Sequence, residues 1–440
     1  MPEGDEKEPS RERFGVSAEE ELRLEVGTAG VTVKLLSGTA EVFGAELPPG
    51  GSIQIRNQNL AVFTWYGCEL EVEGEWSVAY VAGDTPMPSF AGCHRVLNAR
   101  RSDVYKRRYS DPERQVENTA EVGPRVVVVG SPDSGKSTLC RILCNYAVRS
   151  GWTPTYVDLD VSEGLAANMP GAMAAVQLTQ EIAPEALFDP FDPVAYFLGH
   201  TEVEKQVDQA QLLAGKLVAT ALERARSEVL FRASGLVVNT GGWADGQGYD
   251  MLLDVIKDVG ADVVLVLGQE RLYADLKRAL GSPKDGSQPP DVVKLSSSGG
   301  VVARSKEFRQ QARKDRVQTY FYGPGGDLCP HSRVVHFNDL HVHRISKLNA
   351  APLSALPIGM EASFQETVQA TRVPITQELK HSILGISGAE EVEGVLAESV
   401  VGFVWVSDVD LMKERITYLS PSPEAMPKKF LIAGTLKWFE

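Results

Sequence analysis

Residues 130–138, GSPDSGKST, have the composition of a loop that holds the phosphates of a nucleotide. They fit the pattern G-x-x-x-x-G-K-[ST] at every fixed position. Glycines let the backbone bend so that amide N–H groups point at phosphate oxygens, and the following helix presents its positive end to the same anions. Lys136 would reach the β- and γ-phosphates, and the Ser137 hydroxyl would bind Mg²⁺. The predicted nucleotide-binding residues are Gly130, Ser131, Pro132, Asp133, Ser134, Gly135, Lys136, Ser137 and Thr138.

Two carboxylates end the run TYVDLD, residues 155–160. Strand alternation would place Asp158 and Asp160 on the same face. A carboxylate at the C-terminal end of a parallel strand faces the ligand crevice of the sheet. Asp160 is therefore a candidate to hold Mg²⁺ or to take a proton from an attacking hydroxyl, with a capped turn as the alternative.

The segment 304–316 is basic in an otherwise acidic chain. Arg309, Arg313 and Arg316 have the i, i+4, i+7 spacing of one helix face, and Arg304 lies just before them. A run of charges is usually a solvated face. In a nucleotide-binding domain the alternative is a mobile lid whose arginines clamp phosphates, since charge spreads there during phosphoryl transfer.

The run NTGGW, residues 239–243, follows another predicted strand. Gly241 and Gly242 would allow a sharp turn or a close approach to a ligand. Trp243 is either an ordinary core or dimer-contact residue or a platform on which a nucleobase stacks.

Composition limits the possible classes of function. The formal net charge of −15 argues against a broad surface that coats nucleic acid, but not against one local basic groove. The chain has no apolar run long enough for a membrane span and no secretory signal, so no membrane partner is expected. Five cysteines fit a reducing compartment. Cys140 and Cys144 are expected on a buried helix face, and the histidines of 331–343 match no metal-site spacing, so we assign no ligand among them.

The hydrophobic pattern divides the chain into successive regions. Short alternating runs predict an N-terminal β-sandwich or barrel. Buried apolar strands such as RVVVV and DVVLVL then alternate with helices, which predicts a P-loop-type α/β domain around a parallel sheet. Strand patterns return in a small C-terminal β-rich domain. The predicted boundaries are 1–16 for a disordered lead-in, 17–97 for the β domain, 98–120 for a linker, 121–330 for the P-loop domain and 331–440 for the β-rich domain.

Assembled in order, these motifs resemble those of the Clp-type polyribonucleotide 5′-hydroxyl kinases of eukaryotes. The likeness covers nearly the whole chain, including GPRVVVVGSPDSGKSTLCRILCNYAVR, PTYVDLD, NTGGW, QERLYADLKR and SGGVVARSKEFRQQARKDRVQTYFYG. It implies ATP, Mg²⁺ and an RNA acceptor with a 5′-hydroxyl end. It also implies partners among the subunits of the pre-mRNA cleavage and polyadenylation factor or the tRNA-splicing endonuclease complex, and a nuclear location.

The resemblance assigns roles by position. Lys136 is the P-loop lysine, Ser137 the metal ligand, and Asp160 the general base near the metal. The lid arginines are Arg304, Arg309 and Arg313. Trp243, beside Gly241 and Gly242, stacks on the terminal RNA base; Thr201 contacts a substrate phosphate; and Glu21 contacts adenine from the first domain.

Four residues, at three places in the chain, depart from the family pattern. Ser162-Glu163 replaces Gly-Gln, Glu202 follows Thr201 where proline is usual, and Gly268 replaces an aspartate. Glu163 should repel a polyphosphate unless it is turned away. We therefore keep two interpretations besides a P-loop hydrolase: an active RNA kinase, which the intact P-loop, Asp160 and lid arginines favour, and an ATP-bound scaffold without catalysis.

Overall fold

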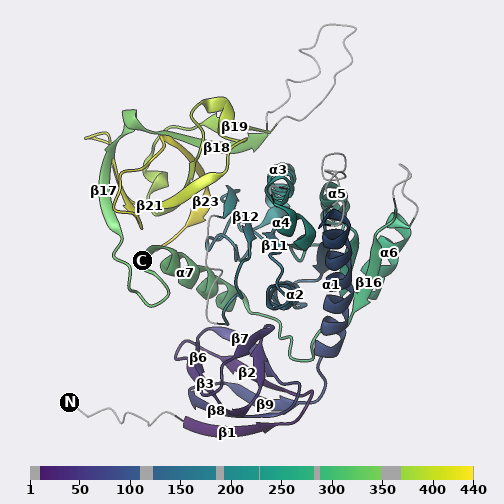
Figure 1. The fold of residues 1–440 in the computed structure, drawn as a ribbon. Helices are drawn as coiled ribbons and strands as arrows, with labels where there is room; N and C mark the ends of the chain where they lie inside the picture. The colour runs from purple at the N-terminus through teal and green to yellow at the C-terminus, as the bar shows by residue number, and fades with distance from the viewer. Residues whose placement is uncertain are drawn as a thin grey trace, which may run out of the picture.

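A computed structural model describes residues 10–109, 122–184, 193–226, 228–281, 288–347 and 368–439. An N-terminal β-sandwich, a central α/β unit and a C-terminal β-rich unit follow one another along the chain (Figure 1). The central unit lies between the other two and contributes to the contacts with both. This arrangement confirms the predicted α/β class with flanking β domains.

The N-terminal sandwich consists of two antiparallel sheets. Alternate apolar side chains, such as Leu22 and Leu24 of one sheet and Val33 and Val72 of the other, fill the space between them. The first sheet has the order β1 (Ser10–Val16), β8 (Cys68–Gly74), β3 (Val31–Gly38) and β6 (Ser52–Ile55). The second has the order β5 (Ala45–Leu47), β4 (Ala40–Val42), β7 (Gln58–Phe63), β2 (Glu21–Val26) and β9 (Val78–Ala82).

The first strand corrects the expected disordered lead-in. Residues 10–16 form β1, which pairs antiparallel with β8, whereas residues 1–9 lie outside the described part. Arg11 and Arg13 both bond to the carboxylate of Glu71, at 2.5 and 3.1 Å. The strand is almost wholly exposed, so it lacks the apolar alternation by which strands are recognised.

Helix α1 (Met87–Tyr109) occupies much of the stretch expected to be a linker, of which residues 110–120 are not described. The helix runs from the sandwich along the central unit (Figure 1). Its Arg101 is fully buried and donates to Ser234 O at 2.9 Å, and its Asn98 accepts from Trp152 Nε1 at 2.5 Å. Residues 98–109 are therefore a packed helix, although their charge-rich sequence is typical of a connector.

Five parallel strands form one end of the central sheet, starting at its edge strand, and the site lies at their C-terminal ends. Their order is β16 (Asp291–Leu295), β15 (Val263–Leu267), β10 (Arg125–Gly130), β14 (Leu236–Asn239) and β11 (Thr155–Asp158). The sheet is mixed rather than purely parallel, because β12 (Ala172–Gln177) pairs antiparallel with β11, and β13 (Val194–Phe197) pairs antiparallel with β12. No helix separates β11 from β12, so the chain turns back instead of crossing over.

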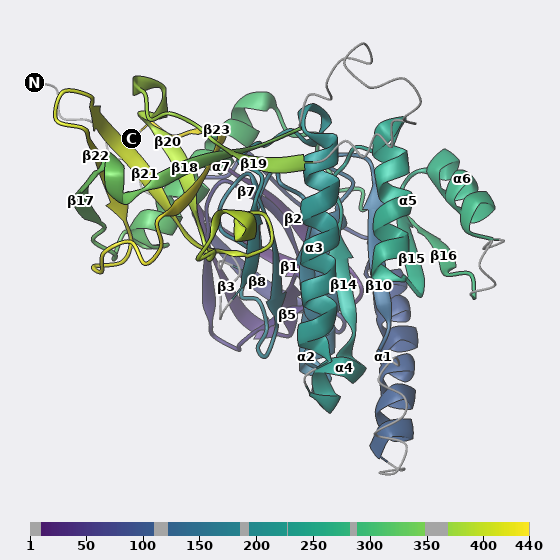
Figure 2. The ribbon, with the colours of Figure 1, turned by 90° about the horizontal axis from the view of Figure 1, so that it is seen from above.

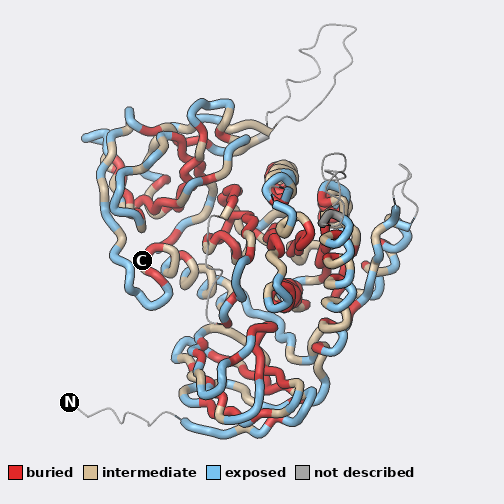
Figure 3. The backbone as a smooth tube through the Cα atoms, in the orientation of Figure 1, coloured by how far each residue is buried: buried red, intermediate tan, exposed pale blue. Residues whose placement is uncertain are grey.

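Alternate valines of β10 supply two cores, one on each face of the sheet. Val126 and Val128 join the core shared with α2 and the sandwich, whereas Val127 and Val129 join the core under α3 and α5. Figure 2 shows α3 and α5 side by side. Figure 3 shows buried backbone inside the central unit and inside both β units. The helices of the central unit are α2 (Lys136–Arg149), α3 (Val207–Ala225), α4 (Val229–Ser234), α5 (Gln247–Val259), α6 (Glu270–Leu280) and α7 (Lys306–Tyr322).

The C-terminal unit continues the central sheet, since Ala195 of β13 pairs with Val400 of β21. Its path continues through β21 (Val400–Asp410), β20 (Ser382–Ser387), β23 (Phe430–Lys437), β18 (His341–Lys347) and β19 (Val368–Arg372), with β22 (Arg415–Ser420) beside β21 and β17 (His331–His336) beside β22. Among the described residues no helix has both the length and the apolar character needed to cross a bilayer.

Candidate active site

The predicted phosphate loop lies between the end of β10 and the start of α2, as its sequence requires. Asp133 has φ 55° and Gly135 has φ 92°, so both bend the loop through the left-handed region. Lys136 is the first residue of α2; its side chain is buried, and its Nζ donates to Ser131 O at 2.8 Å. Burial lowers the pKa of Lys136, although the carboxylates of Asp160 and Asp133 oppose this shift.

Side chains whose oxygen atoms could bind a metal ion, Asp158 and Asn239, lie beside Ser137. Asn239, the last residue of β14, donates from Nδ2 to Asp158 Oδ1 at 2.9 Å and to Ser137 Oγ at 3.3 Å. Burial, and then the charge of Asp160, raise the pKa of Asp158 to about 7. Asn239 Oδ1 is buried and has no hydrogen-bond partner in the described part of the chain. Hydroxyl, carboxylate and amide oxygens are ligands that suit Mg²⁺, so the residues present fit this ion.

Asp160 follows β11 and is held by the next turn. Its Oδ1 accepts from Ser162 N at 3.0 Å and from Ser162 Oγ at 2.6 Å. Burial, and then the charge of Glu163, raise the pKa of Asp160. A carboxylate that is oriented and made more basic in this way can accept a proton from a hydroxyl.

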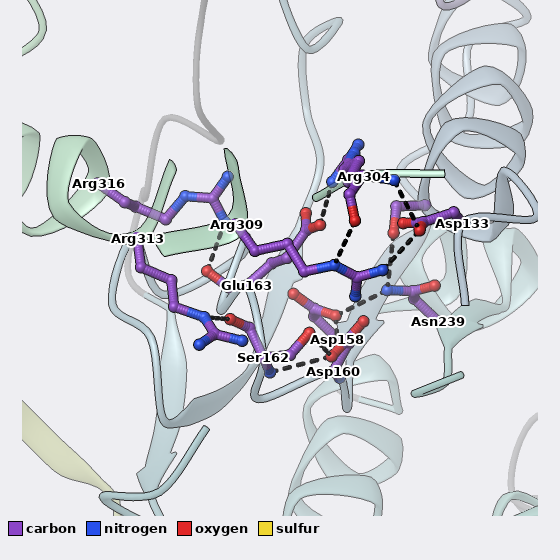
Figure 4. Close-up of polar contacts among 11 residues, drawn as sticks. Asp133, Asp158, Asp160, Ser162, Glu163, Asn239, Arg304, Arg309, Arg313 and Arg316 are labelled. Carbon is purple, nitrogen blue, oxygen red and sulfur yellow. Dashed lines mark hydrogen bonds and ion pairs between the residues drawn. The ribbon is translucent and has the colours of Figure 1, made fainter. Parts of the chain in front are cut away.

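The arginines of the basic segment contact the phosphate loop and the loop after Asp160. Residues 304–322 are called the lid below, and their action as a mobile phosphate clamp stays a prediction. Ser305 caps α7 by accepting from Phe308 N at 3.1 Å, so Arg304 precedes the helix. Arg309 pairs with the carboxylate of Asp133 at 2.5 Å, and Arg313 Nε donates to Ser162 O at 2.9 Å. Figure 4 shows these arginines directed toward the phosphate loop and the loop that follows Asp160.

Glu163 is turned toward the lid. Its carboxylate pairs with the Arg304 guanidinium, and its backbone oxygen accepts from Arg316 (Figure 4). Burial raises the pKa of Glu163, but the charges of Arg304 and Arg316 outweigh this effect and hold it below the ordinary value. The carboxylate that the sequence predicted to repel phosphate is therefore neutralised by an arginine of the lid.

A cleft of about 420 Å³ brings most of the predicted residues together. A Cβ on Gly242 would lie 2.6 Å from Pro132 N, so only glycine lets the TGGW turn approach the phosphate loop this closely. A Cβ on Gly248 would lie 2.7 Å from Trp243 Cγ, which places the indole over the start of α5. The cleft is lined by Pro132, Asp133, Ser134, Gly135, Lys136, Ser137, Thr138, Asp160, Glu163, Thr201, Gly241, Gly242, Trp243, Arg304 and Arg309, among others.

Four predicted residues lie outside this lining: Gly130 and Ser131, which begin the phosphate loop, and Arg313 and Glu21. Arg313 is in a small adjoining pocket with Arg316. Glu21 is buried in β2, where it pairs with Arg23 at 2.7 Å and accepts from Thr85 Oγ1 at 2.7 Å. Its role in adenine binding remains a prediction.

The sequence pattern alone does not predict the contacts of Asn239 or the bond from Arg316 to Glu163 O. The signal for Asn239 was its position at the end of an apolar strand, where polar side chains face the ligand crevice. Cys140 and Cys144 are buried in α2, as expected. The described residues contain no group of three His, Cys, Asp or Glu side chains placed to hold a metal ion.

Family models match three consecutive parts of the chain. They describe the N-terminal beta-sandwich domain of polyadenylation factor over residues 15–104, the mRNA cleavage and polyadenylation factor CLP1 P-loop over 130–323, and the pre-mRNA cleavage complex II protein Clp1 over 328–440.

Individual relatives match over almost their full length. An Arabidopsis thaliana protein named protein CLP1 homolog is 41% identical over 424 residues, which cover 96% of this chain and 93% of that protein. The Homo sapiens polyribonucleotide 5′-hydroxyl-kinase Clp1 is 38% identical over 444 residues, which cover 99% of this chain and 98% of that protein. A solved Clp1p chain in complex with Pcf11p has the same fold, with a TM-score of 0.79 at 20% identity over 98% of this chain and 99% of that chain. The chain therefore belongs to the Clp1 family of polyadenylation-factor proteins.

Proposed function

We propose that this protein transfers the γ-phosphoryl group of ATP to the 5′-hydroxyl end of RNA. The observation that carries the proposal is the convergence of Lys136, Asp160, Arg304 and Arg309 on one cleft that also holds Trp243. A P-loop alone would serve any nucleotide-binding protein. A carboxylate base and an aromatic platform in the same cleft favour an acceptor with both a hydroxyl and a base. Relatives named polyribonucleotide 5′-hydroxyl-kinase support the same reaction.

The residues of the cleft have separable roles in this reaction. Asp160, oriented by Ser162, accepts the proton of the attacking hydroxyl. Lys136 and the guanidinium groups of Arg304, Arg309 and Arg313 stabilise negative charge as it spreads over the transferred group. Mg²⁺, held by Ser137 and Asp160, with Asp158 and Asn239 beside them, would neutralise charge on the nucleotide phosphates.

Binding of the two substrates uses opposite sides of the cleft. The backbone of residues 130–138 and the N-terminus of α2 hold the phosphates of ATP, and Glu21 contacts the adenine. Trp243 stacks on the terminal base of the RNA, and the Thr201 side chain bonds to its first phosphate.

The family also suggests where the protein works. Solved relatives are described in complex with Pcf11p, and the family models are named for cleavage and polyadenylation factors. We propose that this protein joins the corresponding assembly in the nucleus, and that the tRNA-splicing endonuclease complex is a second setting for its kinase activity.

An ATP-bound scaffold is the second candidate. The contacts that favour it are those of Arg304 with Glu163 and of Arg309 with Asp133, because carboxylates there occupy two of the groups that transfer requires. A scaffold would keep these pairs when ATP is bound, whereas a kinase must exchange them for phosphate oxygens.

The fate of the γ-phosphate distinguishes these functions. ATP with a labelled γ-phosphate is incubated with the protein and Mg²⁺, with and without a short 5′-hydroxyl RNA. A kinase places the label on the RNA, and RNA that already carries a 5′-phosphate remains unlabelled. Label in inorganic phosphate without RNA would indicate a hydrolase, and label retained in protein-bound ATP would indicate the scaffold.

A further inference from the structure

We propose that RNA leaving the cleft continues onto the C-terminal unit, where Arg344 binds a backbone phosphate downstream of the 5′ end. This inference rests on the proposed function and assigns the acceptor strand a second binding surface outside the cleft. The surface is a basic arc, defined here as Lys306, Arg313, Lys205 and Arg344.

The loop at residues 199–205 connects the cleft to the C-terminal unit. Thr201 lines the cleft, while Gly199 O accepts from Thr435 N at 2.8 Å and from Leu436 N at 3.1 Å. His200 Nδ1 lies 2.9 Å from Thr435 Oγ1. The two backbones are so close that a Cβ on Gly434 would lie 2.1 Å from Gly199 O. An RNA strand that leaves the cleft past Thr201 therefore reaches β23 first and then β18, which pairs with β23.

Cations surround this loop on both sides. On the C-terminal side, burial and then the charges of Arg344 and Lys205 lower the pKa of His200. On the lid side, Lys205 lowers the pKa of Glu202 through a hydrogen bond and its charge, and Arg313 and Lys306 act in the same direction. Cations of three elements therefore lie near this loop: Lys205 of η2 (Val203–Lys205), Lys306 and Arg313 of α7, and Arg344 of β18.

The groups at the two ends of the arc are available to a ligand. Arg344 and Lys306 are exposed, and neither makes an ion pair within the described ranges. Between them, Lys205 pairs with Glu202 at 2.5 Å, so the carboxylate that replaces the usual proline is already neutralised. In a chain with a net charge of −15, cations without partners at the exit of a nucleotide cleft point to an anionic ligand.

Single-stranded RNA is the ligand that the position of the arc favours. The arc begins on the lid, beside the cleft, and ends beyond Thr201, along the direction in which an acceptor held by its 5′ end must extend. A row of backbone phosphates matches cations spread over three elements, and binding through phosphates needs no particular sequence.

Charge reversal of Arg344 tests the inference, and the same hairpin supplies a matched control. Arg372 of β19 lies opposite His343 of β18, so alternation puts its side chain on the face away from Arg344. Arg372→Glu therefore makes the same change in net charge, on the same two strands, away from the proposed path.

The measurement is the fluorescence anisotropy of a labelled 5′-hydroxyl RNA with the full chain, Mg²⁺ and a non-hydrolysable ATP analogue. Arg344→Glu should weaken binding of a longer single strand by about five- to tenfold, and the slope of log affinity against log salt should become shallower by about 0.7. Binding of a dinucleotide and of the ATP analogue should stay at the wild-type level, which also shows that the variant is folded.

The outcomes separate this inference from the proposed function. Equal affinities of Arg344→Glu and wild type for the longer RNA, or equal losses in Arg344→Glu and Arg372→Glu, would overturn the path over Arg344 and leave the kinase proposal standing. Failure of the wild-type protein to bind either RNA would overturn both.

Discussion

The carboxylate of Glu163 forms an ion pair with the guanidinium of Arg304 at the mouth of the phosphate cleft (Figure 4). One side of this pair belongs to the loop after Asp160 and the other to the lid. The contact holds the lid against the loop, and it also places a negative charge in competition with nucleotide phosphates for Arg304.

Removing that charge should improve the use of ATP. In Glu163→Gln the side chain keeps its size but no longer neutralises Arg304, so kcat/KM for ATP should rise by about two- to fivefold. Steady-state kinetics with 5′-hydroxyl RNA measures the effect. Glu307→Gln, an exposed change on the same lid, should leave kcat/KM unchanged. A fall in kcat/KM for Glu163→Gln would show that the pair positions the lid rather than restrains it.

Trp243→Ala should weaken RNA binding and spare ATP binding. Loss of one base-stacking platform costs about 1–3 kcal/mol of binding free energy, whereas the phosphate loop does not depend on the indole. Calorimetric titrations with RNA and with an ATP analogue separate the two effects, and Trp243→Phe should restore part of the RNA affinity. Equal losses of both ligands would contradict the stacking role.

The contact between Gly199 and Gly434 should make the joint between the central and C-terminal units sensitive to a single methyl group. In Gly434→Ala the new Cβ would lie 2.1 Å from Gly199 O, so the backbones must separate, and the free energy of unfolding should fall by about 1–3 kcal/mol. Gly92→Ala in α1 is the control, because its Cβ meets nothing within 4 Å and alanine favours a helix by up to about 1 kcal/mol. Denaturant unfolding checks both changes, and an unaltered midpoint in Gly434→Ala would contradict the close packing.

His94 should make stability fall in mild acid. Burial, and then the charges of Arg101 and Arg149, lower the pKa of His94 from 6.5 to about 4. His94 therefore takes up a proton at a higher pH in the unfolded chain than in the folded chain. Above pH 6.5 both states are neutral at this residue and the free energy of unfolding is not reduced; as the pH falls from 6.5 toward 4, protonation of the unfolded chain lowers it. The loss should be roughly 1–2 kcal/mol. His94→Gln should show a shallower decline over this window in denaturant titrations, and an identical decline in the two proteins would refute the assignment.

Local spacing in the sequence was enough to predict the chemical parts of the site. The phosphate loop could be predicted because its pattern lies within nine consecutive residues, 130–138. The basic face of the lid could be predicted because Arg309, Arg313 and Arg316 repeat at the spacing of a helix. The two valine-rich strands named above, β10 and β15, were equally clear, since strands buried on both faces are apolar throughout.

Strand pairings and side-chain orientations that depend on residues far apart in the chain could not be predicted from local spacing. The strand β1 depends on Glu71 far along the chain, and the antiparallel direction of β12 depends on the absence of a crossover helix. The orientation of Glu163 is fixed by Arg304, which lies in another element, so the charge of Glu163 could be read from its residue type but its partner could not. The joining of β13 to β21 likewise arises from tertiary packing.

The most direct test of the account is transfer of label from γ-labelled ATP to a 5′-hydroxyl RNA by wild type and by Lys136→Ala, with Mg²⁺ present. The account predicts labelled RNA with wild type and none above background with Lys136→Ala, because the buried ammonium is needed to stabilise the transferred charge. Unlabelled RNA with wild type while ATP stays bound, or equal labelling by the two proteins, would contradict it.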